Sequence, residues 1–236
     1  MLTSTDTGFP EFSEPFRPAD LTGFTDGWVR RFAASATATE AELTALDQQV
    51  GDGDFGANLV AGLQAALRRL GASAPASAAP AWPLEAAASA FLDEVGGTSG
   101  PLFGLLLQEM AAAVAAGDGP PAVALATGAG GGLAAIQRVG EAAVGDKTLV
   151  DALVPACAAL TARARAVPGD PKAATAAAAA AAWGGVRSTA RLTARRGRAS
   201  YLGERAAGVP DPGAVGIALL FASAAEAVPT LTPYLA

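Results

Sequence analysis

Apolar residues recur at spacings of three and four along most of the chain, and runs in which apolar and polar residues alternate are missing. One such stripe consists of Leu59, Leu63, Ala66, Leu67 and Leu70. This period is typical of helices that bury one face, whereas strands repeat every two residues. We predict helices at about 24–36, 38–49, 57–71, 84–95, 101–116, 120–138, 148–165, 171–194 and 213–227. Short connections between them favour an all-α fold of antiparallel helices packed as a bundle.

The pattern divides the chain into an irregular N-terminal arm, residues 1–20, and one helical domain, residues 21–236, in which no internal boundary or repeat stands out. A chain of this size can bury about 70% of its unfolded surface, enough for one well-packed domain or two small ones. The Ala/Ser/Pro stretch at 72–83 predicts a solvent loop. The glycines at 128–132 predict a flexible turn or a loosened helix.

Composition indicates a soluble protein, although 51% of the residues are hydrophobic. Alanine supplies much of that share, and the last apolar stretch, 214–225, is shorter than the about 20 residues that span a bilayer. A net charge of −6 argues against nucleic-acid or anionic membrane partners, which attract clustered Lys and Arg. No targeting segment is visible near Met1.

The chain has no histidine, so a mechanism that needs imidazole must find it on another molecule. Its one cysteine, Cys157, lies in an apolar run and is interpreted as a packing residue, since nothing nearby in the sequence would stabilise a thiolate. One cysteine excludes an intrachain disulfide and a cysteine-based zinc site. These features predict a cytoplasmic protein.

The first polar connection, 46–58, carries three carboxylates, Asp47, Asp52 and Asp54. Three like charges brought together repel one another unless a cation joins them, and Mg²⁺ takes oxygen ligands of this kind. Glycines at 51, 53 and 56 allow the loop to fold around an ion, and the helix that opens at 55–58 offers free N–H groups to an anion. The loop suggests a Mg-nucleotide site; the alternative is a helix-linking turn whose aspartates only cap and face solvent.

Two further connections place hydroxyl or cationic groups next to a predicted helix start. In 96–101, Thr98 and Ser99 offer hydroxyls to a phosphate, and the alternative is that Ser99 is an ordinary N-cap of the helix that Pro101 begins. In 140–151, Thr148 is a candidate helix cap and Lys147 is interpreted as a mobile positive charge. The last connection, from Gly197 to Gly213, is longer than packing requires, and long ordered loops are usually functional. Its arginines at 198 and 205 can each meet phosphate charge.

In combination and in this order, these loops resemble the nucleotide-binding L subunit of dihydroxyacetone kinase, which corresponds to the C-terminal domain of the fused ATP-dependent kinases. The resemblance covers about residues 25–228. The motifs that carry it are Gly51-Asp52-Gly53-Asp54, Gly145-Asp146-Lys147-Thr148 and Gly197-Arg198-Ala199-Ser200-Tyr201-Leu202-Gly203-Glu204-Arg205. The resemblance implies an eight-helix antiparallel barrel with Mg-ADP or Mg-ATP bound at one end.

The resemblance also implies a role for each motif residue. Asp47, Asp52 and Asp54 would hold two Mg²⁺ ions and, with Arg198, form the catalytic group. The remaining contacts would be to phosphates from Phe55, Gly56, Ala57, Asn58, Thr98 and Ser99, to adenine from Gly140 and Leu149, and to the covered nucleotide from Asp211, Pro212 and Gly213.

A kinase subunit of this kind is a phosphotransferase that acts on an alcohol group and is active only with a partner. The resemblance implies that a separate K subunit holds the ketose covalently through a histidine, which accounts for the missing histidine here. Either ADP stays bound and an M-type phosphocarrier of the phosphotransferase system recharges it, or ATP exchanges. Phosphoryl transfer needs positioning and charge stabilisation more than covalent help from the protein.

Phe55 departs from the family, which commonly has histidine directly after the Asp-x-Asp pair. We expect an aromatic face in place of a phosphate-side hydrogen bond, and hence weaker or altered nucleotide contact. Two alternatives stay open: a kinase subunit for another ketose such as erythrulose, and a Mg-nucleotide-binding regulatory module that does not turn over. The intact aspartate trio argues against the regulatory module.

Overall fold

The computed structural model describes residues 18–72 and 79–236, and within these ranges it contains helices and no strands. The all-α prediction is therefore confirmed. The elements are α1 (Pro18–Val50), α2 (Phe55–Ala72), α3 (Trp82–Glu94), α4 (Ser99–Ala116), α5 (Pro121–Gly140), α6 (Val150–Ala166), α7 (Pro171–Thr189), the 3₁₀ segment η1 (Arg198–Ala206), α8 (Pro212–Ala222) and α9 (Thr232–Leu235). Residues 1–17 of the predicted arm lie outside the described residues, and residues 18–20 begin α1.

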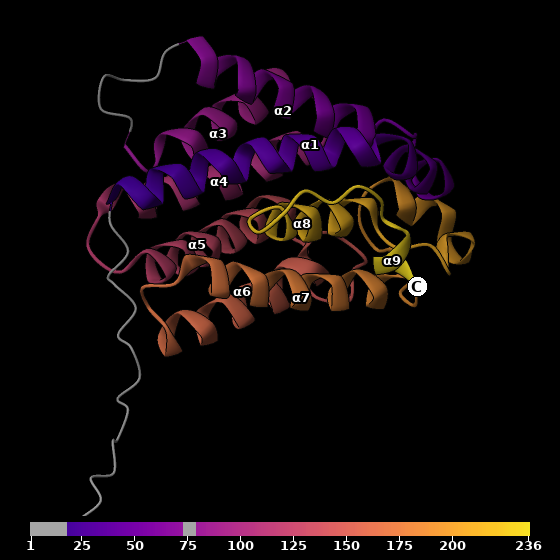
Figure 1. Cartoon of the computed structure of the whole chain (residues 1–236). Coiled ribbons are helices and arrows are strands. Elements are labelled where there is room, and N and C mark those ends of the chain that lie inside the picture. Colours follow the sequence, from indigo (N-terminus) through magenta and orange to yellow (C-terminus); the bar gives the residue numbers. More distant parts are fainter. Residues whose placement is uncertain (1–17, 73–78) are drawn as a thin grey trace, which may run out of the picture.

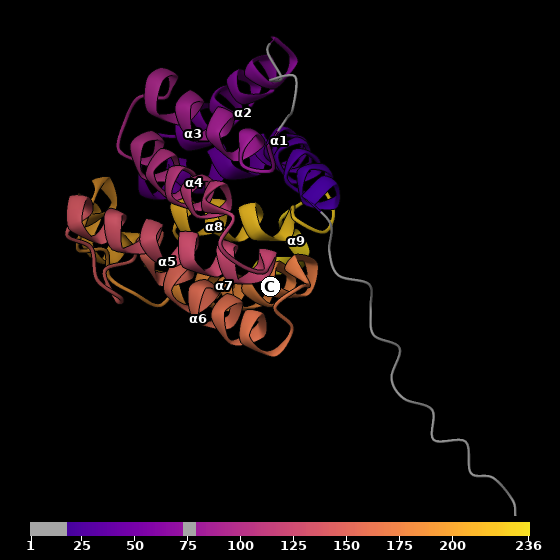
Figure 2. The same cartoon turned by 90° about the vertical axis from the view of Figure 1, so that its left-hand side faces the viewer.

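The helices form an up-and-down bundle (Figures 1 and 2). Each of α1 to α7 packs against the next α-helix in the chain, and α8 also packs against α1, which closes the arrangement. Because antiparallel neighbours alternate in direction, the connections α1–α2, α3–α4, α5–α6 and α7–α8 all fall at one end of the bundle. This alternation brings the four loops with the predicted chemistry to a single place.

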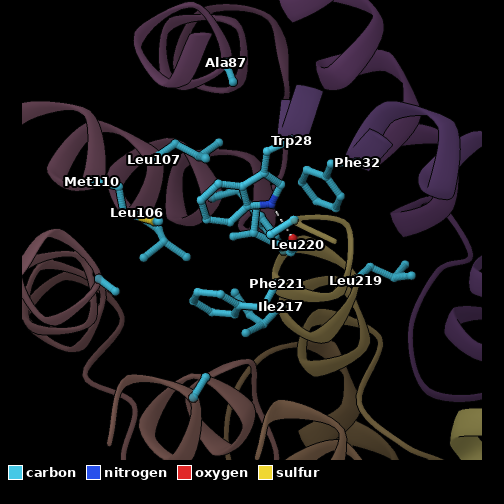
Figure 3. Close-up of a cluster of buried hydrophobic side chains, with 14 of the residues drawn as sticks. Trp28, Phe32, Ala87, Leu106, Leu107, Met110, Ile217, Leu219, Leu220 and Phe221 are labelled. Carbon is cyan, nitrogen blue, oxygen red and sulfur yellow. Dashed lines mark hydrogen bonds between the residues drawn. The ribbon is translucent and has the colours of Figure 1, made fainter. Parts of the chain in front are cut away.

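Helix α8 lies in the core and is apolar on all sides, as a helix surrounded by others must be. Around it pack Trp28 and Phe32 of α1 and Leu106 and Met110 of α4 (Figure 3). The indole Nε1 of Trp28 donates a 2.6 Å hydrogen bond to the Leu220 carbonyl of α8, so this aromatic group is buried without an unpaired polar atom.

Helix α4 is the one described helix that is long and apolar enough to span a membrane by length and composition. It packs against α3 on one side and α5 on the other. Its apolar character is accounted for by this position in the bundle.

The interpretation of 128–132 as a flexible turn is wrong, since this stretch lies inside α5 and its glycines at 128 and 132 pack closely against α4. A Cβ on Gly128 would lie 2.5 Å from the Cα of Met110, and one on Gly132 would lie 2.8 Å from the Cα of Leu106. Because glycine has no side chain, the backbones of α4 and α5 can approach each other closely at these two positions. The glycines in this stretch of the sequence therefore indicate close helix packing and not chain flexibility.

Several predicted helix ends were wrong. The predicted helices 24–36 and 38–49 are one continuous helix, α1, because the hydroxyls of Thr37 and Thr39 bond back to the carbonyls of Ala33 and Ser35 and do not interrupt it. The helix predicted at 171–194 ends at Thr189, whose carbonyl accepts a hydrogen bond from a side chain of another loop.

The helix predicted at 213–227 ends at Ala222. There the guanidinium of Arg31 donates to the carbonyls of Ser223 and Ala224 at 2.8 and 2.7 Å, so these carbonyls are satisfied from α1 rather than by a further helical turn. The short α9 was not predicted.

Candidate functional site

The four loops at one end of the bundle surround a cavity of about 270 Å³. In Figure 1 the α1–α2 and α7–α8 loops meet at the right-hand end of the molecule. Every residue to which the resemblance gives a role lines the cavity except Gly56 and Ala57. Gly56 is instead buried against α1, where a Cβ would lie 2.6 Å from the Glu40 carbonyl oxygen, and Ala57 is exposed on the outer side of α2.

The carboxylates of Asp47, Asp52 and Asp54 lie together, with one oxygen from each within 4.8 Å of the others. Asp47 is in the last turn of α1 and is 8% exposed, and the other two are exposed in the loop. A hydrogen bond of 3.1 Å from the backbone N–H of Phe55 to Asp47 Oδ2 fixes the buried carboxylate. Gly53, at φ 80°, makes the turn between the two exposed ligands. This donor set of oxygens fits a hard divalent cation.

Arg198 stands at the start of η1, with its guanidinium against this carboxylate cluster. Its Nη1 forms an ion pair with Asp52 Oδ2 and lies 3.7 Å from Asp54 Oδ2. The side chain is half exposed, so the pair is accessible to solvent ions and to ligands. The structure thus places the predicted cationic residue at the carboxylate end of the cavity.

The ring of Phe55 points into the core and not toward the cavity mouth, contrary to the expectation from the sequence. Its centroid lies 6.3 Å from that of Phe103, and its tip contacts α8 at Gly216. Only the backbone N–H of Phe55 is directed to the carboxylates, through Asp47. An apolar ring is accommodated here because α2 begins by packing onto α4 and α8.

Thr98 and Ser99 line the cavity at the start of α4. The predicted cap is not found: the helix begins at Ser99 rather than Pro101, its N-cap residue is Thr98, and the Thr98 side chain makes no capping hydrogen bond. The exposed Thr98 hydroxyl is not committed to the helix and can contact a ligand.

The prediction that Thr148 caps the next helix is wrong in its position: the N-cap residue of α6 is Leu149, no side chain caps it, and Thr148 bonds one residue earlier. The Thr148 Oγ1 accepts a 3.2 Å hydrogen bond from Val150 N, and Asp151 Oδ2 accepts one of 2.8 Å from Thr148 N. These two hydrogen bonds hold the turn just ahead of the first residue of α6. Leu149, in this turn, lines the cavity.

Lys147, interpreted from the sequence as a mobile charge, is buried and fixed. It is 1% exposed, and its Nζ donates hydrogen bonds to the carbonyls of Thr189 at 2.7 Å and Val209 at 2.6 Å. Burial lowers the pKa of this ammonium group, against the opposing effect of the nearby Asp211 and Asp151 carboxylates. The motif Gly145-Asp146-Lys147-Thr148 marked this loop as part of a candidate site. No sequence pattern shows which carbonyls will accept hydrogen bonds from the lysine.

Asp211 caps α8, accepting a 2.8 Å hydrogen bond from Ala214 N, while its own N–H donates to Thr189 Oγ1 at 2.9 Å. Burial raises the pKa of this carboxyl to about 7, although the Ala214 N–H and the Lys147 charge act in the opposite direction. With Pro212 and Gly213 it forms the wall of the cavity that faces Leu149.

Comparison with known proteins identifies this arrangement of loops. A family model described as the DAK2 domain matches residues 49–226. The chain belongs to the DAK2 domain family. The carboxylate trio thus begins just ahead of the matched segment of this DAK2 domain, and the other three loops lie within it.

Two groups of relatives differ in length. The chain is 36% identical to L-erythrulose 1-kinase of Mycolicibacterium smegmatis, over 84% of this chain and 34% of that protein. It therefore spans about a third of this and the other long kinases that it matches. It is also 36% identical to the ADP-binding subunit DhaL of the PEP-dependent dihydroxyacetone kinase of Escherichia coli, over 80% of this chain and 89% of that protein.

Solved structures support the same assignment for this DAK2 domain. The native dihydroxyacetone kinase of C. freundii superposes with a TM-score of 0.60 at 25% identity, over 94% of this chain and 38% of that one. A second structure of the same kinase, in complex with AMP-PNP and Mg²⁺, superposes with a TM-score of 0.61 at 24% identity and shows the shared fold.

Proposed function

We propose that this DAK2 domain is the nucleotide-binding, phosphoryl-transferring subunit of a dihydroxyacetone kinase, and that it works in the cytoplasm. The observation that carries the proposal is the trio Asp47, Asp52 and Asp54, whose oxygens gather at the mouth of a cavity built by all four motif loops. The ADP-binding subunits of similar length, of which the chain covers about nine-tenths, support the nucleotide.

The residues present fit a Mg-nucleotide. The three carboxylates would hold two Mg²⁺ ions, which supply the positive charge that lets a polyphosphate approach an anionic loop. Thr98, Ser99 and the start of α2 at 55–58 would contact the phosphates, with the N–H groups of a helix start favouring negative charge. Gly140 and Leu149 would line the part of the cavity that holds the adenine base, and the Asp211–Gly213 turn would cover the bound nucleotide.

The chain's own residues would act by position and charge. Arg198 is the cationic side chain nearest the carboxylates and would meet the charge of the transferred group. Asp47, buried and held by the Phe55 N–H, keeps its carboxylate in place before a ligand arrives. Preorganised charge of this kind lowers the reorganisation needed during transfer.

The acceptor would come on another protein. No histidine is available in this chain to hold a ketose covalently, and a separate K subunit carrying the ketose is the partner that the resemblance implies. An M-type phosphocarrier would recharge bound ADP if the subunit follows the PEP-dependent relatives of similar length. Relatives named erythrulose kinases make erythrulose the second candidate acceptor.

The first experiment is a native mass spectrum of the purified chain without added nucleotide. Retained mass equal to one ADP and two Mg²⁺ would support phosphocarrier-dependent turnover, and an empty chain that takes up Mg-ATP on titration would support exchange. Uptake of neither would contradict the proposed kinase role.

A companion experiment replaces Asp52 with Ala. With the K subunit and ketose present, phosphoryl transfer should fall to background, because the cation loses a ligand. The matched control is Asp118→Ala, an exposed carboxylate between α4 and α5 that does not line the cavity. A nucleotide-independent regulatory module would keep binding its partner after the Asp52 replacement.

A further inference from the structure

Positive charge is concentrated in one segment of the chain. Residues 187–205, which run from the last turn of α7 into η1, hold six of the chain's 16 Lys and Arg residues and one of its 22 acidic residues. The whole chain carries −6, so the rest of it is strongly acidic. A basic segment on an acidic protein attracts a negatively charged partner to one place and leaves the other surfaces to repel it.

This basic segment lies against the α5–α6 loop beside the cavity. The backbone N–H of Arg195 donates a 3.0 Å hydrogen bond to the Asp146 carbonyl, and Arg196 Nη1 lies 3.5 Å from Glu141 Oε2. Each segment also contributes to the cavity wall, the first through Arg196 and the second through Ala142. The two segments are therefore neighbours at the edge of the candidate site.

The same two segments carry the three most exposed large apolar side chains in the part of the chain that the structure describes. Tyr201 of η1 is 90% exposed, Val139 at the end of α5 is 63% exposed, and Val144 in the α5–α6 loop is 62% exposed. Single exposed apolar residues are ordinary on a protein surface. Three of them on adjoining segments that also expose arginines match the composition of protein interfaces, in which tyrosine and arginine are enriched.

The arginines of these segments are held only loosely by their present partners. Arg195 Nη1 lies 3.8 Å from Asp146 Oδ1, and Arg196 Nε lies 3.8 Å from Asp146 Oδ2, both longer than a hydrogen bond. Asp146 is already engaged in its own loop, where its Oδ2 accepts a 2.9 Å hydrogen bond from Ala143 N. Both guanidinium groups are exposed, so they have N–H donors to offer to carboxylates of another molecule.

A ligand inside the cavity would leave most of these groups uncovered. Val139, Val144, Arg195 and Tyr201 do not line the cavity, although residues close to each of them in the chain do. A partner that covers all four must span both segments and approach from the cavity end of the bundle. The mixture of apolar and cationic groups fits a protein surface, whereas the net charge of −6 disfavours nucleic acid.

We propose that Val139, Val144, Arg195, Arg196 and Tyr201 form a docking rim for the protein that brings the phosphoryl acceptor. The matching face of that protein carries carboxylates around an apolar patch. The inference rests on the proposed function, in which the acceptor arrives on another protein. Docking beside the cavity would bring that acceptor close to the carboxylate cluster at the cavity mouth.

The test measures the affinity of the full chain, with Mg-ADP present, for the K subunit by analytical ultracentrifugation. Arg195→Glu should weaken binding about tenfold and reduce its dependence on salt, because the reversed charge repels carboxylates on the partner. Val144→Asp should also weaken binding about tenfold, because it places a charge against the apolar patch. Neither residue lines the cavity, so both variants should bind Mg-ADP as the wild type does, which also shows that they are folded.

Two exposed residues at the opposite end of the bundle provide matched controls. Arg165→Glu, in the last turn of α6, makes the same charge change as Arg195→Glu. Val123→Asp, in the first turn of α5, makes the same change as Val144→Asp. Both controls should bind the K subunit normally. An equal loss in the controls would show that net charge or general destabilisation, and not the docking rim, is responsible, and would overturn the proposal.

The remaining outcomes separate the docking rim from the proposed function. Phosphoryl transfer by the wild-type chain, with unchanged binding of the K subunit by both rim variants, would overturn the docking rim alone. A wild-type dimer that Arg195→Glu converts to a monomer would assign this surface to a second copy of the chain and overturn the proposal. A wild-type chain that does not bind Mg-ADP would overturn the proposed function and this inference with it.

Discussion

The carboxylate of Asp47, in the last turn of α1, accepts a 3.1 Å hydrogen bond from the backbone N–H of Phe55, the first residue of α2. This contact joins the end of one helix to the start of the next across the loop that holds Asp52 and Asp54. The Gly51 N–H, which donates to the Asp47 carbonyl at 2.5 Å, tightens the same turn. The carboxylate cluster is therefore positioned by the helix ends as much as by the loop.

Asp47→Asn should strongly weaken Mg²⁺-dependent nucleotide binding while the chain stays folded. The amide oxygen can still accept from Phe55 N, but the ligand charge is lost, and we expect affinity for Mg-ADP to fall at least about 100-fold. Calorimetric titration with and without Mg²⁺ measures this. Asp26→Asn, at an exposed α1 carboxylate paired with Arg30, is the control that should bind normally.

Arg198→Ala should have opposite effects on the binding of Mg²⁺ and on the rate of phosphoryl transfer. Because the guanidinium pairs with Asp52 and lies near Asp54, its removal should tighten the binding of Mg²⁺ alone about two- to fivefold, the range expected for an exposed ion pair. Transfer of the phosphoryl group should slow. Weaker binding of Mg²⁺ alone would contradict the competition that the ion pair implies.

Phe55→His, which restores the residue common in the family, should destabilise this chain by about 1–3 kcal/mol, because a buried polar ring without a hydrogen-bond partner is costly. The Phe55 ring packs on Phe103 in the core. Urea unfolding of the metal-free protein measures the loss, and Phe55→Leu should cost less because it stays apolar. A histidine variant as stable as the wild type would show that the ring position tolerates polarity.

Replacing Gly128 with Ala should destabilise the fold by about 1–3 kcal/mol, because the new methyl group would meet the backbone of α4. Gly130, in the same helix, has open space around it, and its replacement by Ala should stabilise the protein by up to about 1 kcal/mol through helix propensity. Thermal unfolding of the two variants, which carry the same substitution at different positions, measures whether the first loses stability and the second gains it. Equal effects would rule out close packing of α4 and α5 as the reason for these glycines.

Asp211 should make stability depend on pH. Its folded pKa of about 7 exceeds the ordinary 3.8, so the folded chain binds the proton more tightly, and the free energy of unfolding should fall as pH rises from about 4 to about 7. Asp211→Asn keeps a capping oxygen for Ala214 N and removes this charge. The variant should gain stability relative to the wild type as pH rises from 5 to 8, measured by thermal unfolding without metal or nucleotide.

The control for that comparison is Asp170→Asn. Asp170 caps α7 by accepting from Ala173 N, at the end of the bundle opposite the cavity. If Asp170→Asn gained as much stability with rising pH as Asp211→Asn does, the cause would be the loss of any capping charge and not the buried position of Asp211.

Local pattern determined the helical class, most of the helix positions and the identity of the motif loops. Apolar spacing reports which residues of a helix are buried, and Asp, Gly and hydroxyl residues mark the turns between helices. The antiparallel alternation of consecutive helices then places those loops at one end, so the gathering of Asp47, Thr98, Leu149 and Arg198 around one cavity follows from connectivity.

Tertiary contacts decided the rest, because they join residues that are distant in the chain. The direction of the Phe55 ring depends on space beside Phe103 and Gly216, and the length of α7 depends on a lysine more than forty residues away, since Lys147 takes the Thr189 carbonyl. The glycines of α5 were informative only once α4 was in place beside them. A residue's type limits the bonds it can form, and the packed fold determines which partner is within reach.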